Sequence, residues 1–216
     1  MRELKITING LTPLLMHNVE SMKQNKGVTT IPAPEVEAEA NAYWLDAKHS
    51  ALCAPARVIH PCLGEAGKAF KVGKTKLNYL IASFSHFAPE RISLGKTEYE
   101  IDVQTVVVKR ARIFRARPLV FPWELTFSFW FDPERFSLQL IRDDFPDVIN
   151  HAGSVVGIMD KRPQKRGSNG KFYLTRYELC ALTPQKPLPR PEMIGFDESK
   201  KSVIANDTFP KKRKAA

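Results

Sequence analysis

The feature that most constrains this chain is a long alternating stretch between Tyr99 and Asp132. Apolar and polar residues alternate with period two over residues 99–117 and again over 123–131, which is the pattern of β-strands with one buried face. The first segment also carries a ladder of cations: Lys109, Arg110, Arg112, Arg115 and Arg117. Core positions rarely hold so many guanidinium groups, so we expect this strand to face a polyanion. An ion-paired, solvated sheet face is the alternative.

Composition narrows the class of protein. The chain has 216 residues, 43% of them hydrophobic, and a net charge of +10, which together fit one globular domain with a nucleic acid or an acidic surface as its partner. Met1–Lys5 leads directly into an alternating strand, and no apolar run is long enough to span a bilayer, so we expect neither a signal peptide nor a membrane partner. The three cysteines, Cys53, Cys62 and Cys180, read as reduced thiols, which favours a cytoplasmic location.

The order of the expected elements predicts an α+β fold. We expect one antiparallel sheet with both helices on one of its faces, from strands 4–9, 99–117, 123–131 and 171–179 and helices 56–70 and 137–152. Gly153 is expected to end the second helix. This order is the ferredoxin-like (RRM-like) β-α-β-β-α-β pattern with inserted loops at about 10–54 and 71–98. The domain is therefore assigned to residues 1–183, and residues 184–216 to a basic, proline-rich C-terminal tail.

Three motifs carry a resemblance to a known family. They are the segment Leu11–Asn18, the sequence Arg115-Ala116-Arg117-Pro118 before an aromatic strand, and the glycine-rich segment 152–172. With them the chain resembles the RAMP superfamily of CRISPR-associated proteins, particularly the backbone subunits that polymerise along a guide RNA, and also small phage- and prophage-borne proteins. The resemblance implies that the partners are single-stranded RNA, copies of the chain itself and other CRISPR effector subunits.

The glycine-rich loop is the second expected binding element. It combines four glycines with five cations, namely Gly153, Gly157, Gly167 and Gly170 with Lys161, Arg162, Lys165, Arg166 and Lys171. Glycines allow backbone N–H groups to approach a phosphate, and the resemblance implies that this loop touches the RNA backbone. A basic hairpin without a ligand is the alternative. Lys71, Lys74 and Lys76 are expected either to line the same groove or to form a solvated loop.

Catalytic signals are few. The five histidines show no metal-ligand spacing, so we expect no metal and no other cofactor. His17 is the candidate general acid–base, because relatives in the superfamily that process guide RNA often use a histidine near the start of the fold.

The leading hypothesis is therefore a non-enzymatic, largely sequence-independent binder of single-stranded RNA (or DNA) that acts as a repeating backbone subunit of a CRISPR-type ribonucleoprotein in antiviral defence. Two alternatives stay open. One is a metal-independent, guide-RNA-processing endoribonuclease that uses His17. The other is a phage-encoded mimic of a backbone subunit that acts as an anti-CRISPR protein.

Overall fold

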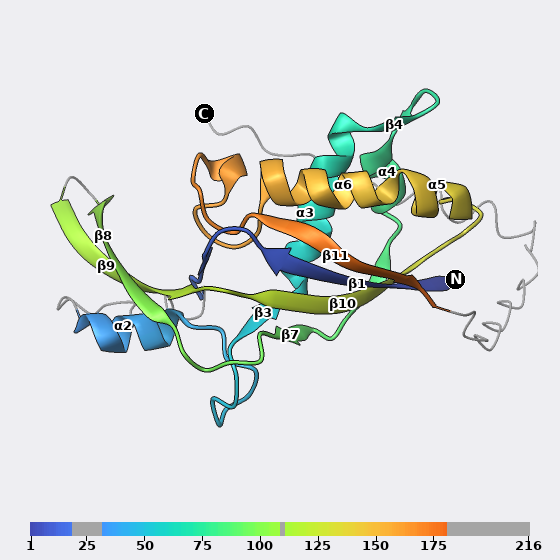
Figure 1. Ribbon diagram of the computed structural model, residues 1–216. Helices are drawn as coiled ribbons and strands as arrows, with labels where there is room; N and C mark the ends of the chain where they lie inside the picture. The colour runs from blue at the N-terminus through green and yellow to red at the C-terminus, as the bar shows by residue number, and fades with distance from the viewer. Residues whose placement is uncertain (19–31, 109–110, 181–216) are drawn as a thin grey trace, which may run out of the picture. The chain divides into compact units, whose positions relative to one another are not determined.

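A computed structural model describes residues 1–18, 32–108 and 111–180 of the chain (Figure 1). These residues all belong to one compact unit, Met1–Thr183. The expected tail, residues 184–216, lies outside the described residues. None of the helices that the described residues form is long and apolar enough to cross a membrane.

The main sheet contains four antiparallel strands. In chain order these are β1 (Arg2–Gly10), β6 (Ser85–Ala88), β10 (Glu124–Phe131) and β11 (Phe172–Leu179). Their order across the sheet is β11-β1-β10-β6, so the first and third of them lie side by side at the centre. The pairing of β1 with β10 runs without a break from Arg2 opposite Phe131 to Asn9 opposite Glu124. Three of the four strands were predicted from their alternation, and the fold is α+β with antiparallel sheets.

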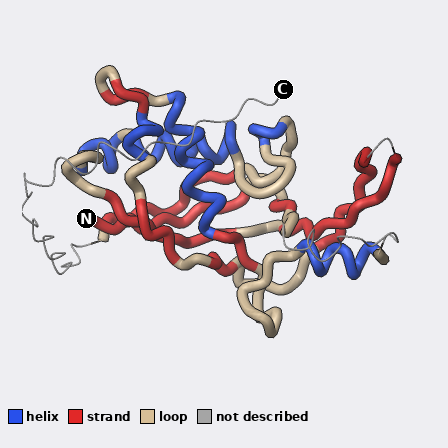
Figure 2. The backbone as a smooth tube through the Cα atoms, turned by 180° about the vertical axis from the view of Figure 1, so that it is seen from behind, coloured by secondary structure: helices blue, strands red, loops and turns tan. Residues whose placement is uncertain are grey.

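The alternation of apolar side chains determines which face of this sheet is buried. Leu4, Ile6 and Ile8 of β1 lie beside Phe127 and Phe129 of β10, and all five are at most 3% exposed. Three helices cover this face, namely α3 (Ile59–Ala66), α5 (Leu138–Asp143) and α6 (Phe145–His151) (Figures 1 and 2). The opposite face carries polar side chains, such as the hydrogen-bonded pair Thr7 and Thr126, with 2.9 Å between their Oγ1 atoms.

The second helical stretch ends later than predicted. Pro146 stands in the first turn of α6, and therefore the stretch is split into α5 and α6. After α6 the chain continues as a short π-helix, η3 (Ala152–Val156), and it leaves the helix at Gly157, whose φ is +70°. The prediction that Gly153 ends this helix was therefore wrong. The left-handed position that favours glycine at a helix end lies four residues further along.

The arginine-bearing segment does not belong to the main sheet. It forms the hairpin β8 (Glu100–Val108) and β9 (Ala111–Val120), and β9 also pairs with the short strand β2 (Leu14–Leu15) in a separate sheet. The prediction of one strand over residues 99–117 in the main sheet was wrong. The fourth strand of the main sheet is instead β6, which lies in a stretch that was predicted to be an inserted loop. Alternation shows that a strand has two unlike faces, but it does not show which sheet the strand joins.

Shorter elements complete the described structure. They are α2 (Pro34–Asn41), β3 (Cys53–Pro55), η1 (Ala56–Val58), η2 (Gly67–Ala69), β4 (Lys71–Val72), β5 (Thr75–Lys76), α4 (Leu77–Ile81), β7 (Arg91–Ser93) and η4 (Pro163–Lys165).

Helix α2 covers the free edge of β9. On the side facing away from β8, the backbone of Ala116 would lack partners. The Glu37 carboxylate accepts a hydrogen bond from the Ala116 amide at 3.0 Å, and the Asn41 side chain donates one to the Ala116 carbonyl at 3.0 Å. Glu37 is only 3% exposed, and its other oxygen lies 2.7 Å from Nη1 of Arg115. Two side chains of α2 thus form the hydrogen bonds to the backbone that a neighbouring strand would otherwise form at this edge.

We expect Glu37→Ala to loosen the hairpin. The variant leaves the Ala116 amide without its acceptor and Arg115 without its buried partner, which costs about 3 kcal/mol. Hydrogen exchange at the Ala116 amide should then be about a hundredfold faster, if it occurs by local opening. Glu35→Ala is the matched control, because Glu35 is exposed in the first turn of the same helix. Equal exchange rates in both variants would contradict this account of the edge.

Candidate nucleic-acid interface

Two arginines of the ladder are committed to ion pairs within the protein. Nη1 of Arg115 lies 2.7 Å from Oε1 of Glu37, and Nη1 of Arg117 lies 2.5 Å from Oδ2 of Asp160. Arg112 is exposed on the hairpin, and Arg110 lies outside the described residues. At Arg115 and Arg117 the structure therefore agrees with the ion-paired alternative, and a nucleic acid would have to compete with carboxylates for them.

The glycines of the segment 153–170 have steric roles. A Cβ atom on Gly153 would lie 1.9 Å from the carbonyl oxygen of Phe172. On Gly167 it would lie 1.8 Å from the carbonyl oxygen of Lys161, and on Gly170 it would lie 2.0 Å from that of Ile158. Any larger residue at these positions would push backbone away, so glycine is required for the loop to fold against β11 and against itself.

The amides of this loop are also engaged. Gly157 donates to the carbonyl of Ala152, Gly167 to that of Arg162, and Gly170 to that of Pro13, with N···O distances of 2.7–3.1 Å. Each amide has one hydrogen, so none of the three is available to a phosphate. The expectation that these glycine amides cradle a phosphate is corrected accordingly. What the loop offers to a ligand is its side chains.

We expect Gly167→Ala to destabilise the protein by about 2 kcal/mol, because the added methyl group overlaps the Lys161 carbonyl. Gly64→Ala is the matched control, since nothing lies within 4 Å of a Cβ built at Gly64 in α3. A glycine in a helix interior costs roughly 1 kcal/mol relative to alanine, so the control should be more stable than the parent. Urea denaturation measures both changes, and a stabilised Gly167→Ala variant would overturn the steric account.

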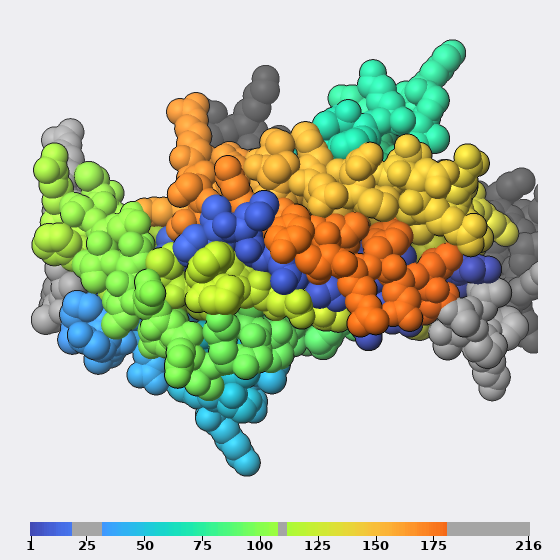
Figure 3. Space-filling view, in the orientation of Figure 1, coloured from blue at the N-terminus to red at the C-terminus, as the bar shows by residue number. Residues whose placement is uncertain are grey.

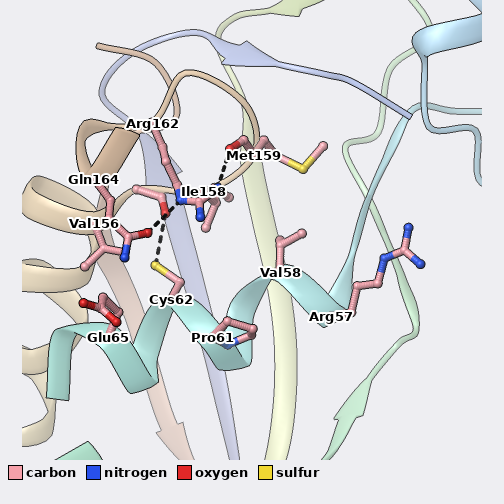
Figure 4. Close-up of a pocket in the computed structure, with 11 residues that line it drawn as sticks. Arg57, Val58, Pro61, Cys62, Glu65, Val156, Ile158, Met159, Arg162 and Gln164 are labelled. Atoms are coloured by element: carbon pink, nitrogen blue, oxygen red, sulfur yellow. Dashed lines mark hydrogen bonds between the residues drawn. The ribbon is translucent and has the colours of Figure 1, made fainter. Parts of the chain in front are cut away.

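Three adjoining hollows make up the candidate interface. The largest, about 340 Å³, lies between α3 and the segment 156–164 (Figure 4). A second of about 200 Å³ shares Val58, Met159 and Arg162 with it, and a third of about 260 Å³ shares Tyr43 with the second and Arg57 with the first. We call this run of hollows the arginine groove, because Arg57, Arg91 and Arg162 line it.

The charges of the arginine groove leave a cationic excess. Its acidic lining residues are Glu65, Glu90 and Asp160. Asp160 is neutralised by Arg117, and Glu65 lies 2.6 Å from Nζ of Lys68. No ion pair joins Arg57, Arg91 or Arg162 to a carboxylate within the described part of the chain. The lining of the groove thus holds three arginines without a carboxylate partner among the described residues and one carboxylate, Glu90, without a cationic partner there, and this excess of positive charge suits a phosphate chain.

Hydrogen bonds orient two of these arginines. Arg162 donates from Nε to Oε1 of Gln164 at 3.1 Å and from Nη1 to the Met159 carbonyl at 3.1 Å. Arg91 donates from Nη1 to the carbonyls of Trp44 and Leu45, at 2.9 and 3.2 Å. A guanidinium group has five N–H hydrogens in a planar fork, so both retain donors for a ligand.

His17 lines the middle hollow. Its Nδ1 lies 3.8 Å from Oδ2 of Asp160, and its side chain is 32% exposed. Burial lowers the pKa of the imidazole below its ordinary value, and the nearby Arg117 guanidinium lowers that pKa further, whereas Asp160 raises it. His17 is therefore mainly neutral at pH 7. A neutral imidazole beside a carboxylate is able to accept a proton, which keeps the catalytic hypothesis open.

Among the predicted cations that the structure describes, Arg162 is the one that lines the hollows. Lys71 and Lys76 stand opposite each other on the β4–β5 hairpin, with Lys74 in its turn, and none of the three lines the arginine groove. This hairpin projects from the helical layer (Figures 1 and 3). Of the five cations predicted in the glycine-rich loop, Arg162 lines the groove. Lys165 and Arg166 are exposed, and Lys161 and Lys171 are half-buried.

Sequence reasoning missed Arg57 and Arg91. Arg57 is exposed in η1, directly before α3, where the expected helix start at residue 56 was the available signal. Arg91 opens a three-residue strand in a segment read as loop, and nothing in its surroundings distinguishes it. In residues 1–18, 32–108 and 111–180, no three His, Cys, Asp or Glu side chains gather where they could hold a metal ion.

Comparisons with known proteins give a likeness to solved structures and none to a known sequence family. No family model matches the chain, and no curated protein matches its sequence. Among solved structures, the fold is similar to that of a chain in the cryo-EM structure of the Type III-B Cmr-beta complex bound to cognate target RNA. The TM-score is 0.52 and the sequence identity 12%, over 82% of this chain and 60% of that one. At this identity the likeness concerns the fold alone, and this chain spans less than two thirds of that one.

Proposed function

We propose that this protein binds single-stranded RNA through the arginine groove, largely without regard to sequence, as a repeating backbone subunit of a CRISPR-type ribonucleoprotein. The observation that carries the proposal is the run of adjoining hollows lined by Arg57, Arg91 and Arg162. Arginine forks match phosphate oxygens in geometry and charge, and contacts to phosphates carry no sequence information. A net charge of +10 adds long-range attraction for a polyanion.

The topology supports the RAMP-like part of the proposal. The main sheet has the order β11-β1-β10-β6, with α3 between β1 and β6 along the chain and α5 and α6 between β10 and β11. We infer that this is a ferredoxin-like β-α-β-β-α-β domain, with the β8–β9 hairpin inserted before its third strand. The fold likeness to a chain of an RNA-bound CRISPR complex is consistent with that assignment. Because many functions share this topology, the argument for RNA rests on the groove.

The β8–β9 hairpin supports the assembly part of the proposal. Ile101, Val103 and Val107 alternate along β8, and Phe114 of β9 stands opposite Thr105 on the same face. These four side chains are 38–68% exposed. An exposed apolar stripe of this kind is typical of protein–protein contacts. We propose that it packs against the next copy of the chain along the RNA.

The salt dependence of RNA binding tests the arginine groove. For a single strand, log affinity falls against log salt with a slope of about −0.7 per phosphate neutralised. Arg57→Ala and Arg162→Ala should each weaken binding to all sequences alike and reduce the magnitude of the slope by about 0.7. Arg142→Ala is the control, because Arg142 is exposed on α5 and lines none of the hollows. If all three variants keep the parent's affinity and slope, the groove is not the phosphate site.

Assembly on RNA makes a separate prediction. As the RNA is lengthened, the mass of the complex should rise in steps of about 24.5 kDa per bound copy. Phe114→Ser should weaken the binding of successive copies without changing the affinity for an RNA that holds one copy. Tyr79→Ser is the matched control, because Tyr79 is 70% exposed on α4, away from the hairpin. One copy per RNA at every length would contradict the backbone role.

A second candidate function is a metal-independent endoribonuclease. The observation in its favour is the neutral His17 beside Asp160 inside the arginine groove. If this function is correct, labelled RNA incubated with the protein and a chelator will be cleaved, and His17→Ala will abolish cleavage while His49→Ala does not. We propose the non-catalytic role as the leading one, so the expected result is intact RNA with the parent protein.

A further inference from the structure

The largest hollow of the arginine groove has the chemistry of a small-ligand pocket. Its volume of about 340 Å³ lies in the range of such pockets, roughly 300–1,000 Å³. Most of its wall is apolar and comes from Val58, Pro61, Val156 and Ile158. Cys62 adds to this wall as a neutral thiol. Burial raises the pKa of the thiol to about 12, and its Sγ donates a hydrogen bond to the Gly157 carbonyl at 3.3 Å. Apolar side chains thus reach the hollow both from residues 58–62 and from the segment 156–164, and such surroundings suit the ring of a base.

The polar groups of this hollow stand on opposite sides. Figure 4 shows Arg162 and Gln164 reaching in from the segment 156–164, with Glu65 on α3 across from them. Oε1 of Gln164 accepts a hydrogen bond from Nε of Arg162, so the amide NH₂ of Gln164 is left for a ligand. Glu65 binds Lys68 through Oε2 at 2.6 Å, and its carboxylate retains further acceptor capacity. The hollow therefore offers donors on one side and a charged acceptor on the other.

We propose that this hollow binds one unpaired guanine base of the strand held by the arginine groove. The inference rests on the proposed RNA-binding function and adds one base-selective position to it. Guanine carries two adjacent donors, N1–H and the 2-amino group, which one carboxylate accepts together. On another edge of the ring it carries the acceptors O6 and N7, which suit the Arg162 fork or the Gln164 amide on the other side of the hollow. Adenine and cytosine place a ring-nitrogen acceptor beside their amino group, so a carboxylate accepts one hydrogen bond from them and is repelled by the ring nitrogen. Uracil places carbonyl oxygens on both sides of its N–H, which a carboxylate repels.

Labelled oligouridylates that differ at one internal position test this inference. In fluorescence anisotropy, the oligonucleotide with one guanosine should bind about tenfold more tightly than the all-uridine one, the size expected for a bidentate base contact. Inosine at that position lacks the 2-amino group and should lose most of the gain, and adenosine should give none.

Two variants assign the effect to this hollow. Glu65→Gln should remove the preference for guanosine, and Gln164→Ala should reduce it, whereas Glu178→Gln, at an exposed position on β11, should keep it. The release of Lys68 in Glu65→Gln affects all oligonucleotides alike, so the ratio of affinities is the quantity to compare. Equal affinities for the guanosine and all-uridine oligonucleotides would overturn the guanine site and leave the RNA-binding proposal standing. If none of the oligonucleotides binds at low salt, both proposals fail.

Discussion

The contact between Arg117 and Asp160 joins the hairpin sheet to the loop that lines the arginine groove. Arg117 belongs to β9 of the hairpin sheet, and Asp160 belongs to the loop that follows the helices. The backbone strengthens this junction, since the Asp160 amide donates to the Leu15 carbonyl at 3.1 Å. Arg162 follows two residues later, and His17 lies beside the same carboxylate. Loss of this ion pair would leave the Asp160 carboxylate in the middle hollow without its cationic partner, so the position of the candidate binding residues beside it depends on this contact.

Local periodicity explains what was predictable in the fold. Strands β1, β10 and β11 and the helical segments bury one face each, and such a face leaves a repeat that can be read within ten residues. Two features of the fold were not predicted, namely strand β6 and the separate sheet of the β8–β9 hairpin, because no local sequence pattern indicates them. Strand β6 has four residues and only half-buried or exposed side chains. The β8–β9 hairpin alternates as clearly as a core strand, but its sheet is decided by contacts with α2 and β2, which are distant in the sequence.

The candidate site was only partly predictable, because its charges are balanced over long separations. Arg115 and its acceptor Glu37 are 78 residues apart, and Arg117 and Asp160 are 43 apart. No short-range pattern reveals such pairs, so four arginines within eight residues were interpreted as a surface for a polyanion. The prediction that the loop glycines bind a phosphate through their amides was wrong for a different reason. Close approach to a phosphate and close approach to the protein's own carbonyls both require the absence of a Cβ, and only the fold shows which of the two applies.

The internal ion pairs also explain why the groove, and not the hairpin, is the better candidate for a binding site. A guanidinium already paired with a carboxylate of the protein has its charge compensated, and a phosphate gains little by displacing that partner. Arg57, Arg91 and Arg162 hold no such partner in the described structure, and Arg91 and Arg162 are oriented by neutral carbonyl or amide oxygens. Their positive charge therefore remains available to a ligand. In the proposed function, affinity would come from phosphates along the groove, and selectivity from the hollow that places the Glu65 carboxylate across from the Gln164 amide.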